Sequence, residues 1–205
     1  RLQVSSLDLF YLHNRDASAA CPETLQTLDQ LVGEGKIQSL GVSNFNQTEL
    51  GDILKVQDEN GFVRMSAIQN NFNYAVSDMS PEFRGYCSKE EIQVITYSPL
   101  GAGFLTGKHR EKVESGSRFD LIPGHQDVYF HEPSLNRLAR LEEVAAQFDL
   151  SQAHLALSWA FHQPGIHTVL IGGRKREHID QALSARQAHL SEVFEALETT
   201  HSGGS

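Results

Sequence analysis

The sequence predicts an α/β protein built on a parallel β-sheet. Short runs rich in β-branched and aromatic residues alternate along the chain with longer segments that carry apolar residues at helical spacing. The strand-like runs are apolar at consecutive positions, which is typical of parallel strands that helices cover. Short connections between these runs favour right-handed βα units. A doubly wound sheet and a β/α barrel both have this pattern.

Length, charge and cysteine content limit the class of protein. The 205 residues, 40% of them hydrophobic, suffice for one globular domain with a core. A net charge of −9 argues against nucleic acid as a partner, because phosphate backbones are bound by clustered Lys and Arg. The two cysteines are too few for a disulfide framework and suit a reducing compartment. Neither a signal-peptide pattern nor an apolar run of about 18 residues occurs, so we expect a cytoplasmic protein without a membrane partner.

Five segments are predicted as strands from their β-branched and aromatic content. Each is four to eight residues long, as strands are, and each is followed by a change to polar residues or glycine. The predicted strands are Leu7–Leu12, Ile37–Val42, Met65–Gln69, Ile92–Tyr97 and Ile166–Ile171.

Helix signals lie between these strands. Pro22 and Glu23 open the first helix, which we expect to end near Val32 because glycines follow. The segments Gly101–Glu132 and Leu190–Ser205 are expected to be loop-like, with a loose tail at residues 200–205. The other predicted helices are Gln47–Gln57, Ser80–Lys89, two within Pro133–Phe148 and Ser151–Phe161, and one from about Arg176.

All five predicted strands end in hydrogen-bonding side chains or glycines. In both candidate architectures, ligands bind at the carboxyl ends of the parallel strands. One polar strand end is ordinary, but five in succession indicate a site along one face of the sheet. The residues concerned are His13 and Asn14, Ser43 and Asn44, Gln69 and Asn70, Tyr97 and Ser98, and Gly172, Gly173 and Arg174.

Three cations stand where the last predicted helix begins. Arg174, Lys175 and Arg176 are placed unfavourably against the helix dipole, which prefers anions at its N-terminus. In an acidic protein, this concentration of positive charge indicates an anionic ligand such as a phosphate. The alternative is an ordinary solvated helix end, because Lys and Arg are usually exposed.

Five segments together resemble the aldo-keto reductases in order and spacing. They are "LDLFYLH", "GKIQSLGVSNF", "AIQNNFNY", "YSPLGAGFLTGK" and "VLIGGRKREHIDQAL", and the resemblance extends from about Leu7 to Leu183. It implies NADPH-dependent reduction of small-molecule aldehydes or ketones on a (β/α)₈ TIM barrel. The five predicted strands match strands four to eight of that barrel, so we expect an incomplete (β/α)₈ barrel.

The resemblance also implies roles for individual residues. His13 matches the carbonyl-orienting histidine of a catalytic tetrad of Asp, Tyr, Lys and His. The segment at Arg174 matches the site of the adenosine 2′-phosphate of NADP(H), although His178 stands where relatives often have Gln. The implied cofactor-binding residues are Ser43, Asn44 and Gln69 for the carboxamide, Tyr97 for the nicotinamide ring, Ser98, Leu100, Gly101 and Gly103 for the pyrophosphate, and Gly172, Arg174, Lys175 and His178 for the adenosine phosphate.

Simpler interpretations of the same residues stay open from the residues alone. His13 and Tyr97 are also explained as strand-end packing residues, and the Gly101–Gly103 loop as a flexible surface segment. Ser43 and Asn44 are also explained as an N-cap cluster before the helix at Gln47. The other histidines show no ligand spacing with carboxylates or cysteines, so no metal site is expected.

The Asp, Tyr and Lys of the tetrad have no match in this sequence. The family carries them on its first three βα units, whereas this sequence begins at the end of the third. Tyr11 shares the strand face of His13 but is expected to pack, and Lys36 precedes its strand at the opposite end of the sheet. We therefore expect the chain alone to be inactive.

Two hypotheses remain for the function. The first is a carbonyl reductase whose N-terminal third is absent from this sequence, and the alternative is a non-catalytic nucleotide-binding or interaction half-barrel. Open sheet edges at Leu7–Leu12 and Ile166–Ile171 also predict self-association, because unpaired strands pair with other chains.

Overall fold

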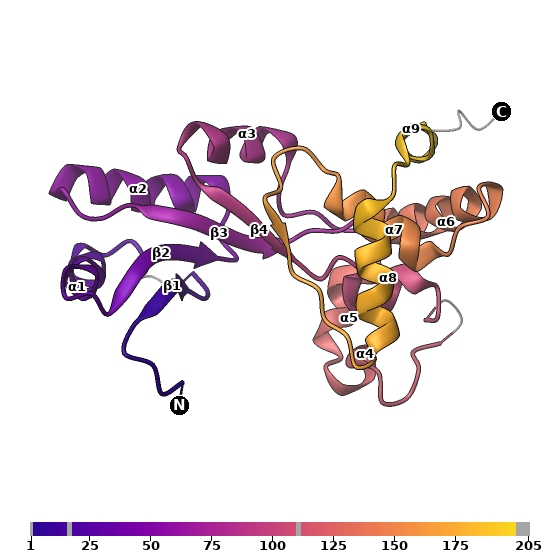
Figure 1. Ribbon diagram of the computed structural model, residues 1–205, viewed down its shortest axis with the longest axis horizontal. Helices are drawn as coiled ribbons and strands as arrows, with labels where there is room; N and C mark the ends of the chain where they lie inside the picture. The colour runs from indigo at the N-terminus through magenta and orange to yellow at the C-terminus, as the bar shows by residue number, and fades with distance from the viewer. Residues whose placement is uncertain (1, 16–17, 110–111, 200–205) are drawn as a thin grey trace. The chain divides into compact units, whose positions relative to one another are not determined.

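The chain folds as an α/β protein with a five-stranded sheet (Figure 1). This computed structural model describes residues 2–15, 18–109 and 112–199, so the tail expected at 200–205 lies outside the described residues. The strands follow one another across the sheet in chain order, as successive parallel βα units do. The strands are β1 (Leu7–Leu12), β2 (Ile37–Ser43), β3 (Met65–Asn71), β4 (Gln93–Tyr97) and β5 (Thr168–Val169).

Helices occupy most of the remaining described chain. A 3₁₀ segment, η1 (Gly101–Thr106), follows β4. No helix among the described residues is both long and apolar enough to cross a membrane. The α-helices are α1 (Pro22–Gly33), α2 (Gln47–Asn60), α3 (Pro81–Lys89), α4 (Arg118–Leu121), α5 (Gly124–Tyr129), α6 (Glu132–Gln147), α7 (Gln152–Phe161), α8 (Arg176–Gln187) and α9 (Ser191–Glu198).

The chain divides into two compact units. The first contains the described residues through Asn70, with Asp78–Thr96 and Gly165–Thr168. The second contains Asn71–Ser77, Tyr97–Pro164 and the described residues from Val169 onward. Each unit has its own buried apolar side chains, and the site residues are divided between the two.

The first unit packs α1, α2 and α3 alongside its strands (Figure 1). In α2, Leu50, Ile53 and Leu54 are fully or nearly fully buried, which is the helical spacing that the sequence shows. This helix begins at a capping box, in which Asn46 accepts a hydrogen bond from the Glu49 amide while the Glu49 carboxylate accepts one from the Asn46 amide. The predicted α2 is therefore confirmed.

The two end strands differ from the prediction. β1 was expected to be buried on both faces, but its side chains are half-buried or exposed. β5 was expected over Ile166–Ile171, but only Thr168–Val169 is a strand, and Leu170 and Ile171 are 42% and 36% exposed. An end strand has a neighbour on one side only, so it buries less surface. Directly before β5, Nδ1 of the His167 side chain also accepts the hydrogen bond of the Val94 amide at 3.0 Å, in place of a strand carbonyl.

The second unit has an aromatic core. The Phe72 ring stacks on Trp159 with the ring centroids 5.2 Å apart, and Tyr74 meets the same Trp159 edge-on at 5.4 Å. The Tyr74 hydroxyl donates a hydrogen bond to the Leu197 carbonyl at 3.1 Å. Burial and the nearby Glu198 carboxylate raise the pKa of Tyr74 to about 12, so this hydroxyl keeps its donated proton at neutral pH.

Two segments expected to be loop-like contain helices. Leu190–Ser205 contains α9, whose Val193 and Leu197 are buried. Gly101–Glu132 contains η1, α4 and α5, which bury Phe119 and Tyr129. Each of these helices is shorter than an isolated helix can sustain in water, so packing stabilises them and local sequence does not reveal them. The described residues of both segments contain no strand, as expected.

Candidate functional site

In the first unit, the polar residues at the carboxyl ends of β1, β2 and β3 lie at one edge of the sheet. The parallel register pairs Leu12 with Val42, and Ser43 with Gln69. His13 therefore follows β1 beside the end of β2, and Ser43 lies beside Gln69. The sequence predicted this row from the change of polarity at each strand end, and for these three strands the prediction is confirmed.

Asn44 joins the three strand ends through hydrogen bonds. Its side-chain amide donates to the His13 carbonyl and to Oδ1 of Asn14, both at 2.9 Å. Its backbone amide is 3.1 Å from the Gln69 carbonyl and 2.9 Å from Oδ1 of Asn70. Asn44 has a φ of 64°, a left-handed conformation that Asn tolerates better than most residues. In this conformation Asn44 forms hydrogen bonds with residues at the ends of both β1 and β3.

Ser43 and Asn44 do not cap the helix that follows them. The N-cap of α2 is Asn46, so the simpler interpretation of Ser43 and Asn44 as a capping cluster is wrong. The buried Ser43 hydroxyl donates to the Gln69 carbonyl at 2.8 Å, and its oxygen accepts from the Asn44 side-chain amide at 3.3 Å, which leaves one lone pair of the oxygen as an acceptor. A carboxamide ligand of Ser43 would therefore have to donate from its NH₂ group.

Asn70 was noticed as a strand-end residue but was not assigned to the site. Its side chain is 1% exposed, accepts a hydrogen bond from the Asn44 amide, and donates to the Phe45 carbonyl at 2.7 Å. It also donates to the sulfur of Met79 at 3.3 Å. Asn70 therefore holds the β2–α2 connection that carries Ser43 and Asn44.

We predict that Asn70→Ala lowers the free energy of unfolding of the chain by about 1–3 kcal/mol, because it leaves the carbonyl of the buried Phe45 without its donor and removes one of the two acceptors of the Asn44 amide. Urea denaturation followed by circular dichroism measures this change. Asn60→Ala, at an exposed side chain near the end of α2, is the matched control and should change stability by less than about 0.5 kcal/mol. Equal effects of the two substitutions would contradict the role of Asn70.

Tyr11 packs across β2. A Cβ atom on Gly41 would lie 2.7 Å from Cε1 of Tyr11, so only glycine leaves room for this ring. Burial raises the pKa of Tyr11, an effect that a hydrogen bond with the Gln69 side chain partly opposes. A tyrosine with a raised pKa holds its proton more firmly than a free phenol. This is the opposite of what a proton donor in carbonyl reduction requires.

In the second unit, the loop after β4 has an unusual backbone. Ser98, Gly101, Ala102 and Gly103 all have positive φ values, between 56° and 98°. The loop turns through hydrogen bonds from the Gly101 amide to the Ser98 carbonyl at 2.8 Å, and from the Gly103 amide to the Leu100 carbonyl at 3.0 Å. Backbones in such conformations expose successive amide groups and can bind anions. The simpler interpretation as a flexible segment does not account for this set of turns.

Buried polar side chains, Asn71, Asn73 and Tyr129, form a hydrogen-bond network that contacts this loop. Asn73 donates a hydrogen bond to the Ser98 carbonyl at 3.0 Å, and the Tyr129 hydroxyl donates to Oδ1 of Asn71 at 3.2 Å. The Tyr129 ring lies against Gly101, where a Cβ atom would be 2.8 Å from Cε1. Neither Asn73 nor Tyr129 could be assigned from the sequence, because the two lie 56 positions apart and only their contact in the fold brings them to the loop, although Asn73 lies within the segment "AIQNNFNY".

Tyr97 and Leu100 flank the loop in different ways. Tyr97 is half-buried, and its carbonyl accepts the Phe72 amide at 3.3 Å. Leu100 packs against Leu157 of α7 and Ala182 of α8. This packing connects the loop to α8, the helix that follows the cationic segment.

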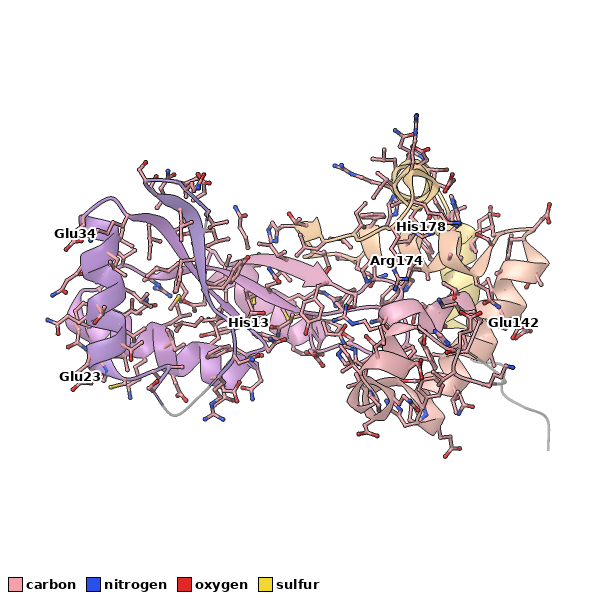
Figure 2. The ribbon with its side chains drawn as sticks, turned by 90° about the horizontal axis from the view of Figure 1, so that it is seen from below. His13, Glu23, Glu34, Glu142, Arg174 and His178 are labelled. Carbon is pink, nitrogen blue, oxygen red and sulfur yellow. The ribbon has the colours of Figure 1, made fainter. Side chains whose placement is uncertain are left out.

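The cationic segment stands where the sequence predicts it. Lys175 is the N-cap residue of α8, and the structure gives it no side-chain capping bond. Arg174, Lys175 and His178 are exposed, and Figure 2 shows Arg174 and His178 at this end of α8. Arg176 forms an exposed ion pair with Asp180 at 3.4 Å, whereas Arg174 and Lys175 make no ion pair within the described chain. Two cations are therefore available here to a ligand.

Of the two glycines before this segment, Gly173 is the one that the fold requires. A Cβ atom on Gly173 would lie 2.8 Å from Cβ of His178, whereas one on Gly172 would meet nothing within 4 Å. Gly173 therefore lets the chain pass close to the first turn of α8. The open space beside Gly172 leaves room for a ligand at its backbone.

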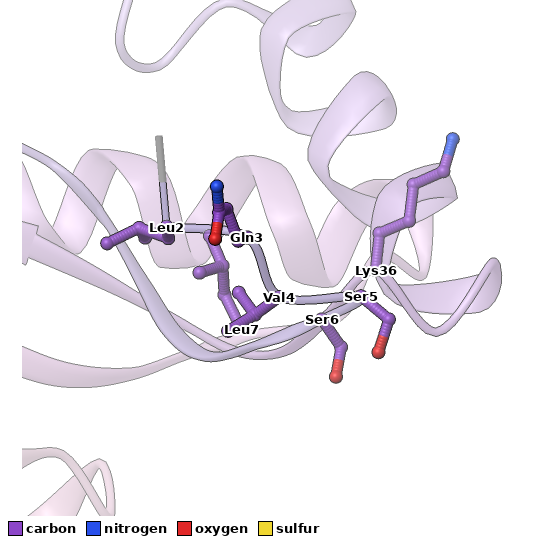
Figure 3. Close-up of a pocket in the computed structure, with 7 residues that line it drawn as sticks. All are labelled: Leu2, Gln3, Val4, Ser5, Ser6, Leu7 and Lys36. Atoms are coloured by element: carbon purple, nitrogen blue, oxygen red, sulfur yellow. The ribbon is translucent and has the colours of Figure 1, made fainter.

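A separate surface pocket lies at the other end of the first unit's strands. Figure 3 shows that it is lined by Leu2–Leu7 and Lys36, which precede or begin β1 and β2. His13 and Ser43 stand at the opposite, carboxyl ends of those strands. We therefore do not assign this pocket to the site. Within the described ranges, no three His, Cys, Asp or Glu residues are grouped to hold a metal ion.

The chain is similar to known reductases over most of its length. The family model of the aldo/keto reductase family matches residues 1–198. "Probable aldo-keto reductase 1" of Glycine max is 30% identical over 203 residues, which cover 96% of this chain and 57% of that protein. "Aflatoxin B1 aldehyde reductase member 4" of Homo sapiens is 29% identical, and the match covers 91% of this chain and 61% of that protein. "Aflatoxin B1 aldehyde reductase member 2" of Rattus norvegicus is 28% identical, and the match covers 91% of this chain and 55% of that protein.

The chain therefore spans little more than half the length of these curated relatives. The match nevertheless includes all five strands and every residue assigned from the sequence, from His13 to His178. An aldo/keto reductase has a (β/α)₈ barrel, and five parallel strands in chain order are what part of such a barrel contains. On the family match, the chain belongs to the aldo/keto reductase family.

Proposed function

We propose that this chain is the cofactor-binding part of an NADP(H)-dependent aldo-keto reductase, and that it corresponds to strands four to eight of the (β/α)₈ barrel. The observation that carries the proposal is the exposed cationic segment Arg174–Arg176 at the N-terminus of α8, in a chain of net charge −9. Cations oppose the helix dipole at this position, and a bound phosphate relieves that cost. The 2′-phosphate of NADP(H) is such an anion.

The residues in the chain fit NADP(H) in three places. Arg174 and Lys175 would hold the 2′-phosphate, with Gly172 and His178 beside them. The loop Ser98–Gly103 would hold the pyrophosphate through its backbone, and Tyr97 would stack on the nicotinamide ring. Ser43, Asn44 and Gln69 would hold the carboxamide, with the Ser43 oxygen as acceptor. When bound, NADPH supplies the hydride that reduces a carbonyl.

His13 is the residue of this chain that we assign to the substrate. It is exposed after β1, in a row with the proposed carboxamide ligands Ser43 and Gln69. From there its imidazole would donate a hydrogen bond to the carbonyl oxygen and so orient and polarise it. Two relatives are named as aldehyde reductases, and we propose an aldehyde or ketone as the substrate class for this protein as well.

A second candidate is a nucleotide-binding protein that does not catalyse reduction. It is favoured by the absence of a tyrosine–lysine pair at the strand ends that the structure describes. Tyr11 packs against Gly41, and Lys36 precedes β2 at the opposite end and pairs with Glu34 at 2.6 Å. Both candidates bind NADP(H), so they differ only in turnover.

Arg174→Ala tests the shared part of the proposal. We expect it to weaken NADPH binding by about 10–100-fold and NADH binding by less than about 3-fold, since a charged hydrogen bond to phosphate is worth about 1.5–3 kcal/mol. Titration of each cofactor against the fluorescence of the single tryptophan, Trp159, measures both constants. Arg186→Ala, in the last turn of the same helix, is the control and should leave both unchanged. Equal losses for the two cofactors in Arg174→Ala would rule out the 2′-phosphate assignment.

A further inference from the structure

His109 is a buried histidine that the proposed function does not use. Its side chain is 3% exposed and lies edge-on to the Phe119 ring, with centroids 5.0 Å apart. Nδ1 accepts a hydrogen bond from the Glu114 amide at 3.3 Å. The other ring nitrogen, Nε2, is excluded from solvent and finds no hydrogen-bond partner within residues 2–15, 18–109 and 112–199.

The protonation of this ring follows from its contacts. Because Nδ1 accepts a hydrogen bond, the proton of the neutral imidazole is on Nε2. Burial lowers the pKa of His109, and the nearby Lys108 ammonium lowers it further against a weaker opposite effect of Glu114. At neutral pH, Nε2 is therefore an N–H donor without an acceptor. Buried donors are nearly always paired in folded proteins, so this one requires an explanation.

Nε2 lies beside the positive-φ loop. A Cβ atom on Gly103 would be 3.6 Å from Nε2 of His109 and 3.6 Å from Nζ of Lys108. Gly103 has a φ of 98°, so a residue with a side chain is disfavoured there, and the Lys108 side chain lies in the space beside it, with Cε 3.0 Å from that Cβ position. An N–H donor and an ammonium group thus converge on one point beside the positive-φ loop. This combination is selective for an anionic oxygen.

Lys108 can leave its ion pair at little cost. Its ammonium pairs with the Glu114 carboxylate at 3.4 Å, and the two side chains are 43% and 52% exposed. Exposed ion pairs of this kind are weak. The lysine can therefore leave Glu114 and turn to a ligand beside Gly103.

We infer that Nε2 of His109 donates a hydrogen bond to a diphosphate oxygen of the dinucleotide bound at the Gly101–Gly103 loop. The inference rests on the proposed function, because it needs the dinucleotide to lie at this loop. It adds a buried side-chain donor to a contact otherwise made by the backbone. The ligand chemistry is a diphosphate diester, which carries negative charge throughout the neutral range.

ADP-ribose is the probe, because it has the diphosphate but neither the nicotinamide nor the 2′-phosphate. We expect His109→Phe, which keeps an aromatic ring against Phe119, to weaken ADP-ribose binding by about 10-fold or more in calorimetry. His109→Gln keeps a donor near Nε2 and should stay within about 3-fold of the wild type. His125→Phe, in the same connection between β4 and α6, is the control and should have no effect. Equal affinities of the two His109 variants would overturn the inference.

A measurement on the unmodified chain covers the case in which His109→Phe does not fold. The imidazole N–H signal of His109 is identified by nitrogen-15 NMR as the one that His109→Gln lacks. Adding ADP-ribose should shift this signal, and adding adenosine should not. If ADP-ribose binds and the signal does not move, the inference about His109 is wrong while the proposed function still stands. If the wild-type chain binds neither ADP-ribose nor NADPH, both the proposed function and the inference about His109 are wrong.

Discussion

The chain alone should show no NADPH-dependent reduction of a generic aldehyde, and adding a fragment with the first three βα units of a relative should restore turnover. The reason is that polarising a carbonyl does not reduce it: a proton must also reach the oxygen. In this family a tyrosine made more acidic by a lysine supplies that proton, and Tyr11 has its pKa raised instead. Loss of NADPH absorbance, for the chain with and without the fragment, is the measurement.

In the restored enzyme, His13→Ala should lower kcat by about two orders of magnitude, the range that a positioned acid–base group contributes. His189→Ala, at an exposed histidine between α8 and α9, is the control and should keep full turnover. Turnover by the chain alone would show that it contains its own proton donor. No turnover with the fragment, while the chain still binds NADPH, would favour the non-catalytic candidate.

The isolated chain should also self-associate. We propose that β1 and β5, the two end strands of the sheet, pair with another copy, because end strands present unpaired backbone groups. The side chains of β1 are partly exposed, and Leu170 and Ile171 after β5 are exposed apolar residues. Light scattering at micromolar concentration should give at least twice the monomer mass of 22.8 kDa.

Charges at the exposed edge should reverse this association. The double substitution Leu170→Lys and Ile171→Lys should shift the mass toward that of the monomer, because charged side chains protect sheet edges. The matched control places lysines at Leu121 and Ile122, which are 70% and 46% exposed at the end of α4 and outside the sheet. A monomeric wild-type chain, or equal effects of the two double variants, would contradict pairing through β5.

Local patterns determined most of the first unit. The strand Leu7–Leu12 has the bounds predicted for it, and α2 begins at Gln47 as predicted, because a run of apolar residues and a helical repeat are both local signals. Other boundaries moved by one to three residues: β2 extended to Ser43, β3 to Asn71 and α2 to Asn60. The row His13, Ser43 and Gln69 could be predicted because parallel strands in chain order bring their carboxyl ends to one edge.

Roles within the site were harder to predict. The cationic segment was recognisable because its charge contradicts the helix dipole at the place where it stands. Gly172 and Gly173 are adjacent glycines that the sequence does not distinguish. Only the structure shows that the fold requires Gly173, because of its close contact with His178, and that Gly172 lies beside open space. Asn70 was visible as a polar strand end, but its three bonds depend on where Phe45 and Met79 lie.

The sequence by itself determined the family, the alternation of strands and helices, and the strand ends where polar residues gather. Only the tertiary structure decided that β5 is short, that α9 forms, that Tyr129 supports the Gly101 loop, and that Nε2 of His109 is unpaired. These features depend on contacts between residues far apart in the chain: Tyr129 and Asn73 are 56 positions apart, and Tyr74 and Leu197 are 123 apart. Burial and hydrogen-bond pairing are properties of those contacts, so a local sequence pattern does not contain them.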